Sequence, residues 1–149
     1  MSPEPFFGGE GQTIIAPIGE SMRPLLRTGR DTVALRKIDA RLNPGDVALY
    51  KRPSGVLVLH RVIAVSPASY AFLGDAQDMA ELEQGVTDSQ LIGVMTGFFR
   101  GAKYIGIDNP FYRVYRRICL SGDGPRRALR ALRSCWLAVK GAPRSAKNK

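Results

Sequence analysis

The most informative stretch of the chain is IGESMRPLLRTGRDTVALRKI, residues 18–38. Its first half combines Ser21 with Pro24 and flanking glycines, which neither a helix interior nor a regular strand accommodates well. Its second half, residues 31–38, carries β-branched side chains and predicts a strand. The segment therefore predicts a bend followed by a strand. The bend either connects two strands or presents Ser21 as a nucleophile at the edge of a sheet.

Short runs of apolar and β-branched residues, separated by Gly, Pro, Asn and Asp, recur on both sides of this stretch. The turns between them leave no room for helices of 10–15 residues, so the pattern predicts an antiparallel or mixed β-fold. Residues 56–65, VLVLHRVIAV, are the best candidate for a central strand, and residues 76–90 are expected to form a loop or short helix. The predicted strands are 12–18, 31–38, 47–52, 56–65, 70–75 and 91–99.

The length of 149 residues suits a single domain with a modest core. We expect a flexible arm at 1–11, the main domain at 12–108 and a basic tail at 109–149 with helices over 109–120 and 126–141. No apolar run reaches about 18 residues, so no transmembrane helix is predicted. The N-terminus lacks the basic and apolar pattern of a signal peptide, so we expect a cytoplasmic protein.

The positive charge of the chain is concentrated in its tail. Residues 1–112 carry a net charge of −1, whereas residues 113–149 carry +10. The tail either packs an apolar stripe on the sheet, lies on an anionic membrane surface as a peripheral anchor, or binds nucleic acid. The absence of a recognised nucleic-acid motif argues against the last partner. The apolar stripe consists of Leu129, Leu132, Trp136 and Val139.

The residues for acid–base chemistry are few. His60 is the only histidine, and Cys119 and Cys135 have no metal-ligand spacing, so we expect no metal and no cofactor. A serine nucleophile needs a base and a group that orients the base. His60 on a rigid strand is suited to be the base, and Asp75, at the tip of the next strand, to orient it. A lone histidine in an apolar strand is nevertheless more often an ordinary core residue.

Six short boxes occur in a fixed order along the chain, and by this ordered set the chain resembles the signal peptidase I and LexA-like serine peptidase superfamily. The resemblance covers about residues 13–97. The boxes are SM-x-P at 21–24, G-x-D-x-V at 29–33, PGDV at 44–47, HRVIAV at 60–65, LGD at 73–75 and DSQLIGV at 88–94.

The resemblance implies a mostly β catalytic domain of coiled antiparallel sheets, followed here by the basic helical tail. Ser21 would be the nucleophile and His60 the base, as in the Ser-His branch of endoplasmic-reticulum and archaeal-type signal peptidases. Asp75 matches the Gly-Asp box, and Met22 and Pro24 would shape the bend at the oxyanion and substrate site. The substrate would be an extended precursor or leader peptide, added along a strand edge and cut beside small side chains.

The chain also departs from the family pattern. Gly19 stands where many members carry a hydroxyl residue, so the oxyanion hole would rest on backbone N–H groups. The segment GDAQDMAELE offers Asp78 or Glu81 as the supporting acid instead of Asp75. Only 20 residues precede Ser21, so we expect neither the usual membrane anchor nor a DNA-binding domain before it.

Two other interpretations follow from these departures. In the first, the domain would be a non-catalytic peptide-binding or regulatory module whose tail binds membrane or nucleic acid. In the second, the protein would cleave itself in the arm around residues 8–11. The interpretation that we carry forward is a serine endopeptidase of the signal peptidase type.

Overall fold

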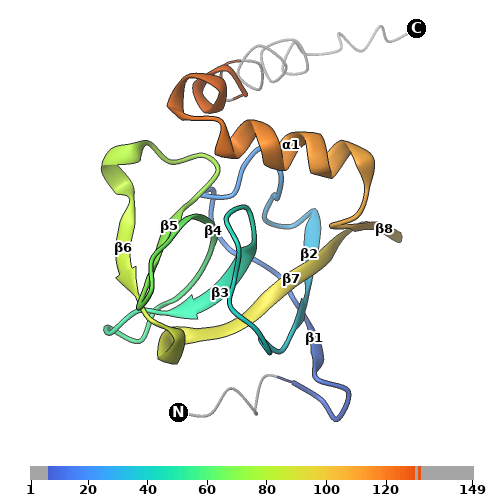
Figure 1. Cartoon of the computed structure of the whole chain (residues 1–149). Helices are drawn as coiled ribbons and strands as arrows, with labels where there is room; N and C mark the ends of the chain where they lie inside the picture. The colour runs from blue at the N-terminus through green and yellow to red at the C-terminus, as the bar shows by residue number, and fades with distance from the viewer. Residues whose placement is uncertain (1–6, 130, 132–149) are drawn as a thin grey trace, which may run out of the picture.

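The computed structural model describes residues 7–129 and 131. These residues form a mostly β structure with a helix lying across one end of the sheet, as Figure 1 shows. The main helix is α1 (Pro110–Leu120), and short 3-10 turns occur at Met79–Glu81 and Asp88–Gln90. The strands are β1 (Gln12–Ile15), β2 (Asp31–Arg36), β3 (Val47–Lys51), β4 (Leu57–Val65), β5 (Tyr70–Leu73), β6 (Glu83–Val86), β7 (Leu91–Arg100) and β8 (Lys103–Gly106).

All pairings in this sheet are antiparallel, in the order β1-β2-β7-β3-β4-β5-β6, with β8 paired to β7. The strand β7 is the longest, and β3 and β8 share one of its edges. Register shifts interrupt four of the pairings, and such irregularities bend and twist a sheet. The prediction of a mostly β, antiparallel fold is confirmed.

Alternation along the strands produces two cores on opposite faces of the sheet. In β3, Val47 and Leu49 belong to one hydrophobic cluster, called the first, whereas Ala48 and Tyr50 belong to the second. Successive side chains along a strand point to opposite faces of the sheet. A strand that is buried on both faces therefore has a continuous run of apolar residues in its sequence. This is why VALYK shows no polar alternation, and it places β3 and β4 in the interior of the sheet.

The six predicted strands are all present, and β4 lies between β3 and β5 as expected of a central strand. Two strands, β6 and β8, were not predicted. Each is only four residues long, and half of the residues in each sequence, EQGV and KYIG, are exposed. A short edge strand of this kind carries little apolar pattern because only one side of it packs on the sheet.

The C-terminal region begins with a helix that packs on the domain. Asn109 caps α1 by accepting hydrogen bonds from two backbone N–H groups of its first turn, and Pro110 follows at the first helical position. Tyr112 and Cys119 are buried. A second helix begins at residue 123, three residues before the predicted start, and its described part reaches 129 and 131. Tyr112 belongs to the same hydrophobic cluster as Val47 and Leu49, so α1 packs on the core of the sheet.

Several expectations for the ends of the chain concern residues outside the described ones. These are most of the flexible arm, the end of the second helix, Cys135 and three of the four stripe residues, Leu132, Trp136 and Val139. Within the arm, Phe7 packs against the first hydrophobic cluster. Among the described residues, no helix has both the length and the apolar character needed to cross a membrane.

Candidate active site

Ser21 lies on a tight bend between β1 and β2, as the opening stretch predicts. The next residue, Met22, is 5% exposed and anchors the bend in the first hydrophobic cluster. Its carbonyl accepts a hydrogen bond of 3.0 Å from the N–H of Leu26, and the Ser21 carbonyl accepts one of 2.8 Å from Ala76. Pro24 follows within the same turn. Met22 and Pro24 thus occupy the bend to which the resemblance assigns them, and Met22 lines the cleft beside Ser21.

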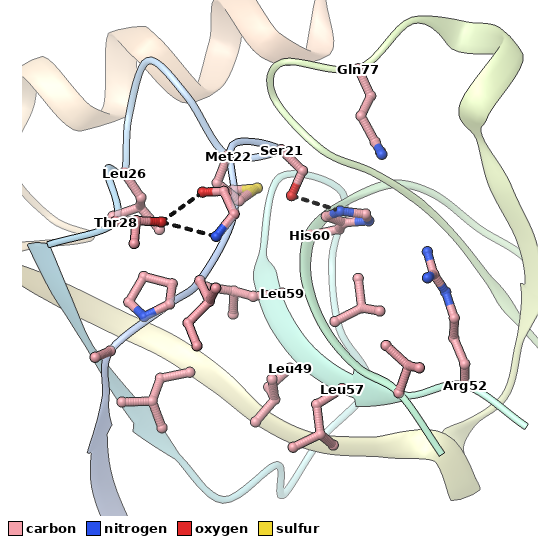
Figure 2. Close-up of a pocket in the computed structure, with 17 residues that line it drawn as sticks. Ser21, Met22, Leu26, Thr28, Leu49, Arg52, Leu57, Leu59, His60 and Gln77 are labelled. Atoms are coloured by element: carbon pink, nitrogen blue, oxygen red, sulfur yellow. Dashed lines mark hydrogen bonds between the residues drawn. The ribbon is translucent and has the colours of Figure 1, made fainter. Parts of the chain in front are cut away.

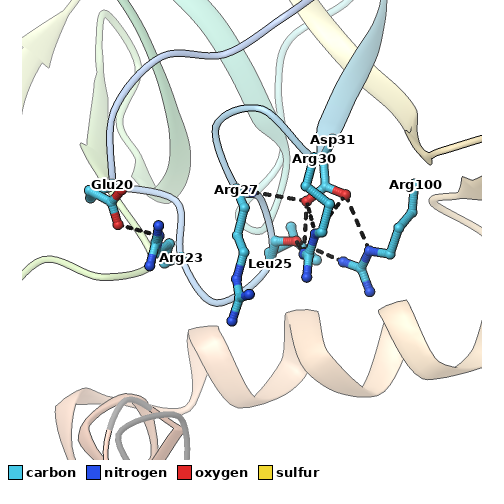
Figure 3. A network of polar contacts seen from close by, with 7 residues as sticks. All are labelled: Glu20, Arg23, Leu25, Arg27, Arg30, Asp31 and Arg100. Carbon is cyan, nitrogen blue, oxygen red and sulfur yellow. Dashed lines mark hydrogen bonds and ion pairs between the residues drawn. The ribbon is translucent and has the colours of Figure 1, made fainter. Parts of the chain in front are cut away.

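The loop that follows this bend is held by a buried carboxylate, Asp31, which is 2% exposed at the start of β2 (Figure 3). It accepts hydrogen bonds from the guanidinium groups of Arg30 and Arg100 and from the backbone N–H of Arg27 at 2.9 Å. Burial raises the pKa of Asp31, but these hydrogen bonds outweigh it and lower the pKa below its ordinary value. The G-x-D-x-V box therefore fixes the base of the Ser21 loop to the sheet.

His60 faces Ser21 from the central strand β4. Its Nε2 lies 3.1 Å from the Ser21 Oγ, a hydrogen-bond distance between a base and a hydroxyl nucleophile (Figure 2). The imidazole is 3% exposed, and this burial lowers its pKa to about 4, despite the opposing effect of the Glu83 charge. The ring is consequently neutral near pH 7, which a general base requires. Two residues 39 positions apart are brought together as predicted.

An open cleft of about 500 Å³ surrounds the Ser21 hydroxyl and the His60 ring. Figure 2 shows it between the segment that leaves β1 and the first half of β4. Its walls are mainly aliphatic, and Arg52 and Gln77 contribute polar groups at its edge. The aliphatic side chains include Ile15, Ile18, Leu26, Leu49, Leu57 and Leu59.

Gly19 stands at the position where the resemblance predicts a hydroxyl residue, and the hydroxyl of Thr28 forms hydrogen bonds with its backbone. The Thr28 Oγ1 accepts from the N–H of Gly19 and donates to its carbonyl, both at 2.9 Å (Figure 2). Gly19 adopts a φ of +107°, which favours glycine. Thr28 therefore closes the loop around Ser21, and the sequence pattern alone did not indicate this pairing.

Asp75 does not contact His60, so its predicted role as the orienting acid is not supported by the geometry. Both of its carboxylate oxygens belong to a buried ion pair with Arg61. One oxygen lies 2.8 Å from Arg61 Nε, and the other lies 2.9 Å from Arg61 Nη2. The Tyr115 hydroxyl donates a further hydrogen bond of 2.9 Å. Arg61 and His60 are neighbours in β4 and point to opposite faces, so a carboxylate that satisfies one lies away from the other.

The second predicted acid, Asp78, lies before the 3-10 turn Met79–Glu81 and is exposed. Its backbone N–H donates to the Glu81 side chain at 3.1 Å. Neither ring nitrogen of His60 faces these two residues, because Nε2 faces Ser21 and Nδ1 faces a different group. The GDAQDMAELE segment therefore does not supply a direct partner for the base.

The group that faces His60 Nδ1 is the hydroxyl of Tyr50, at 3.4 Å. Tyr50 is fully buried in β3, and its pKa is raised first by this burial and then by the charge of Glu83 in β6 and a hydrogen bond to it, against the opposing effect of Arg52. Arg52 forms an ion pair with Glu83, donating a 2.7 Å hydrogen bond from Nε and a second hydrogen bond from Nη2. The sequence pattern does not indicate these residues, because VALYK is typical of core packing and residues 83–86 do not predict a strand.

A residue of the basic tail contacts the segment that packs against the Ser21 loop. Arg126 is 2% exposed and donates a 2.7 Å hydrogen bond to the carbonyl of Gly74. Gly74 itself packs so closely against the Ser21 loop that a Cβ at this position would lie 2.5 Å from the Ser21 carbonyl oxygen. Arg126 therefore packs inward, whereas three of the four residues of the apolar stripe lie outside the described residues.

No protein-family model matches the chain, and comparison with curated proteins finds no similar sequence.

Proposed function

We propose that the protein is a serine endopeptidase with Ser21 as nucleophile and His60 as general base. The observation that carries this proposal is the 3.1 Å contact between Ser21 Oγ and His60 Nε2 at an open, apolar cleft. A structural serine would not need a neutral imidazole directed at its hydroxyl from a buried strand position. The mostly β architecture and the ordered boxes agree with a catalytic domain of the signal peptidase and LexA-like type.

The reaction would follow the usual acyl-enzyme course. Ser21 Oγ attacks the carbonyl carbon of the scissile bond while its proton moves to His60 Nε2. As the C–N bond breaks, the imidazolium returns this proton to the leaving amine nitrogen. Water then attacks the acyl-enzyme, with His60 accepting a proton from it and returning the proton to Ser21. Backbone N–H groups at the Ser21 bend are the candidate donors for the developing oxyanion.

An extended peptide fits the cleft because one edge of β4 is open there. In the part of the chain that the structure describes, β5 pairs with β4 only from Arg61 onward, while β3 covers the other edge from Leu57. The backbone of 57–60 can therefore pair with an added strand, which would bring the scissile bond toward His60. The aliphatic walls favour small or apolar side chains on either side of the cut. A precursor or leader peptide has this character.

The decisive experiment profiles the cleavage of a proteome-derived peptide library by the purified chain, with new N-termini identified by mass spectrometry. We expect a defined set of cuts for the wild type and none for Ser21→Ala or His60→Gln. Ser121→Ala removes an exposed hydroxyl on the C-terminal segment and should leave the cuts unchanged. Cuts that persist in a folded Ser21→Ala variant would refute the assignment. A wild type that binds the library but never cuts it would favour the peptide-binding module.

A further inference from the structure

Both ring nitrogens of His60 have a partner in the structure, and the second partner is not the acid that serine peptidases commonly use. We propose that the hydroxyl of Tyr50, directed by the carboxylate of Glu83, keeps the His60 proton on Nδ1 and leaves Nε2 free to accept the proton of Ser21. As far as it concerns cleavage, this inference rests on the proposed function. The position of the proton itself does not.

The first step of the argument is that Tyr50 is rigidly placed. It is fully buried in β3, the strand that pairs with β4, and its ring lies 4.4 Å from that of Phe72. The rings of Tyr50 and His60 meet edge to face, with centroids 6.3 Å apart and planes at 64°. The hydroxyl therefore stays beside Nδ1, and the 3.4 Å separation needs only a small movement to shorten.

The second step concerns the direction of the hydrogen bonds. A phenol has one proton to donate and lone pairs to accept with, so Tyr50 can donate to Glu83 or to His60 but not to both. Glu83 is a carboxylate that accepts only, and its ion pair with Arg52 keeps it charged. Burial raises the pKa of Glu83, but hydrogen bonds from Arg52 and Tyr50 lower it below its ordinary value. With an acceptor carboxylate on one side and the Arg52 guanidinium, which only donates, on the other, the Tyr50 hydroxyl donates to Glu83, and its oxygen accepts from Arg52 and from Nδ1–H.

The third step is that Tyr50 stays neutral. Its pKa is raised, first by burial and then by the charge of Glu83 and the hydrogen bond to it. The phenol consequently exchanges no proton with His60 at neutral pH. It orients the imidazole and accepts a hydrogen bond from the imidazolium that forms when Ser21 attacks. Tyr50 and Glu83 are positioning residues, because neither touches the reacting atoms.

The test reads the proton on the single histidine of the chain directly. The untagged protein is labelled with ¹⁵N-histidine, and two-bond ¹H–¹⁵N correlation spectra are recorded at pH 7. We expect the wild type to hold its proton on Nδ1. Tyr50→Phe removes the only proposed acceptor for Nδ1–H, so the proton should move to Nε2, where the Ser21 Oγ can accept it.

Glu83→Gln is the second variant, and it keeps the tyrosine and the packing of the core. Arg52 donates to one side-chain oxygen of Glu83, and in the variant it would hold the amide oxygen there, which turns the NH2 group of the Gln toward Tyr50. The Tyr50 hydroxyl would then accept from this group and donate to Nδ1, so the proton again moves to Nε2. Tyr70→Phe is the matched control. Tyr70 is also a buried tyrosine that donates to a carboxylate, at 2.7 Å to Asp88, and it belongs to the same hydrophobic cluster. It should leave the His60 proton on Nδ1.

The inference would be overturned if the wild type held its proton on Nε2. It would also be overturned if a folded Tyr50→Phe or Glu83→Gln variant kept the proton on Nδ1. Both outcomes count whatever the cleavage assay shows. With a cleavable peptide in hand, Tyr50→Phe should lower kcat about tenfold with little change in KM, because the lost hydrogen bond acts mainly on the imidazolium. A Ser21→Ala variant that still cleaves would overturn the proposed function without moving the NMR result.

Discussion

The burial of His60 makes the stability of the fold depend on pH in the range in which histidine titrates. The pKa of His60 is lowered to about 4 in the folded chain, mainly by burial, whereas an unfolded chain titrates histidine near 6.5. Between these values the unfolded state binds a proton that the folded state does not. The free energy of unfolding must therefore fall as the pH is lowered through this range.

The size of the effect follows from the two pKa values. At pH 8 both states hold a neutral His60, so the residue contributes nothing to the pH dependence. At pH 5 the unfolded state is almost fully protonated and the folded state is not, which destabilises the fold by about 2 kcal/mol. The loss approaches about 3 kcal/mol below pH 4. Asp31 and Asp39, whose pKa values are lowered, lose their stabilising effect mainly below this range, as they protonate in the folded state.

Urea unfolding of the wild type and of His60→Gln at pH 8 and pH 5 isolates this contribution. Carboxylates and chain termini titrate in both proteins, so their contributions to the pH dependence of the free energy of unfolding cancel in the comparison. We expect the wild type to lose about 2 kcal/mol more than the variant between the two pH values. An NMR titration of the imidazole gives the folded-state pKa independently. Equal pH dependence in both proteins, together with a midpoint near 6.5, would refute the argument that burial controls His60.

Two substitutions, each paired with a control substitution, test how the surroundings of the site are held. Asp75→Asn breaks a fully buried ion pair and should lower the free energy of unfolding by about 3–5 kcal/mol, whereas Asp78→Asn should change it by less than about 0.5 kcal/mol. Similar values for the two, or loss of cleavage in a stable Asp78→Asn, would contradict these roles. Gly74→Ala places a methyl group 2.5 Å from the Ser21 carbonyl oxygen and should cost about 1–3 kcal/mol and most of the cleavage activity. Gly124→Ala, with open space around it in the second helix, is the control; it should leave cleavage unchanged and should not lower the free energy of unfolding.

The central pair of the site was predictable because each member carries a local signal. Ser21 lies among residues that force a bend, and His60 interrupts an apolar run that predicts a central strand. A signal for the Asp75 ion pair was also present. Arg61 follows His60 in the same apolar run, and a buried guanidinium needs a carboxylate partner. The nearest Gly-Asp box supplies it, so the carboxylate assigned to the base belongs to the neighbouring arginine.

The remaining partner of His60 could not be predicted from local pattern. Tyr50 belongs to a strand buried on both faces, where a tyrosine reads as core packing. Glu83 lies in β6, a short polar strand that pairs with β5 at the edge of the sheet. The contact between Tyr50 and Glu83 depends on how the sheet curls between β3 and β6, and no spacing in the sequence encodes that curl.

The positive charge of the C-terminal segment does not all lie on the surface of the described residues. The segment carries most of the net positive charge, which suggests an exposed surface for anions. Yet Arg126 is buried and bonds the Gly74 carbonyl, while Tyr115 of α1 bonds Asp75 in the adjacent position. These contacts brace the loop that packs directly against Ser21. The first part of the segment therefore packs inward, and its contacts with Gly74 and Asp75 help to hold the Ser21 loop opposite β4, the strand that carries His60.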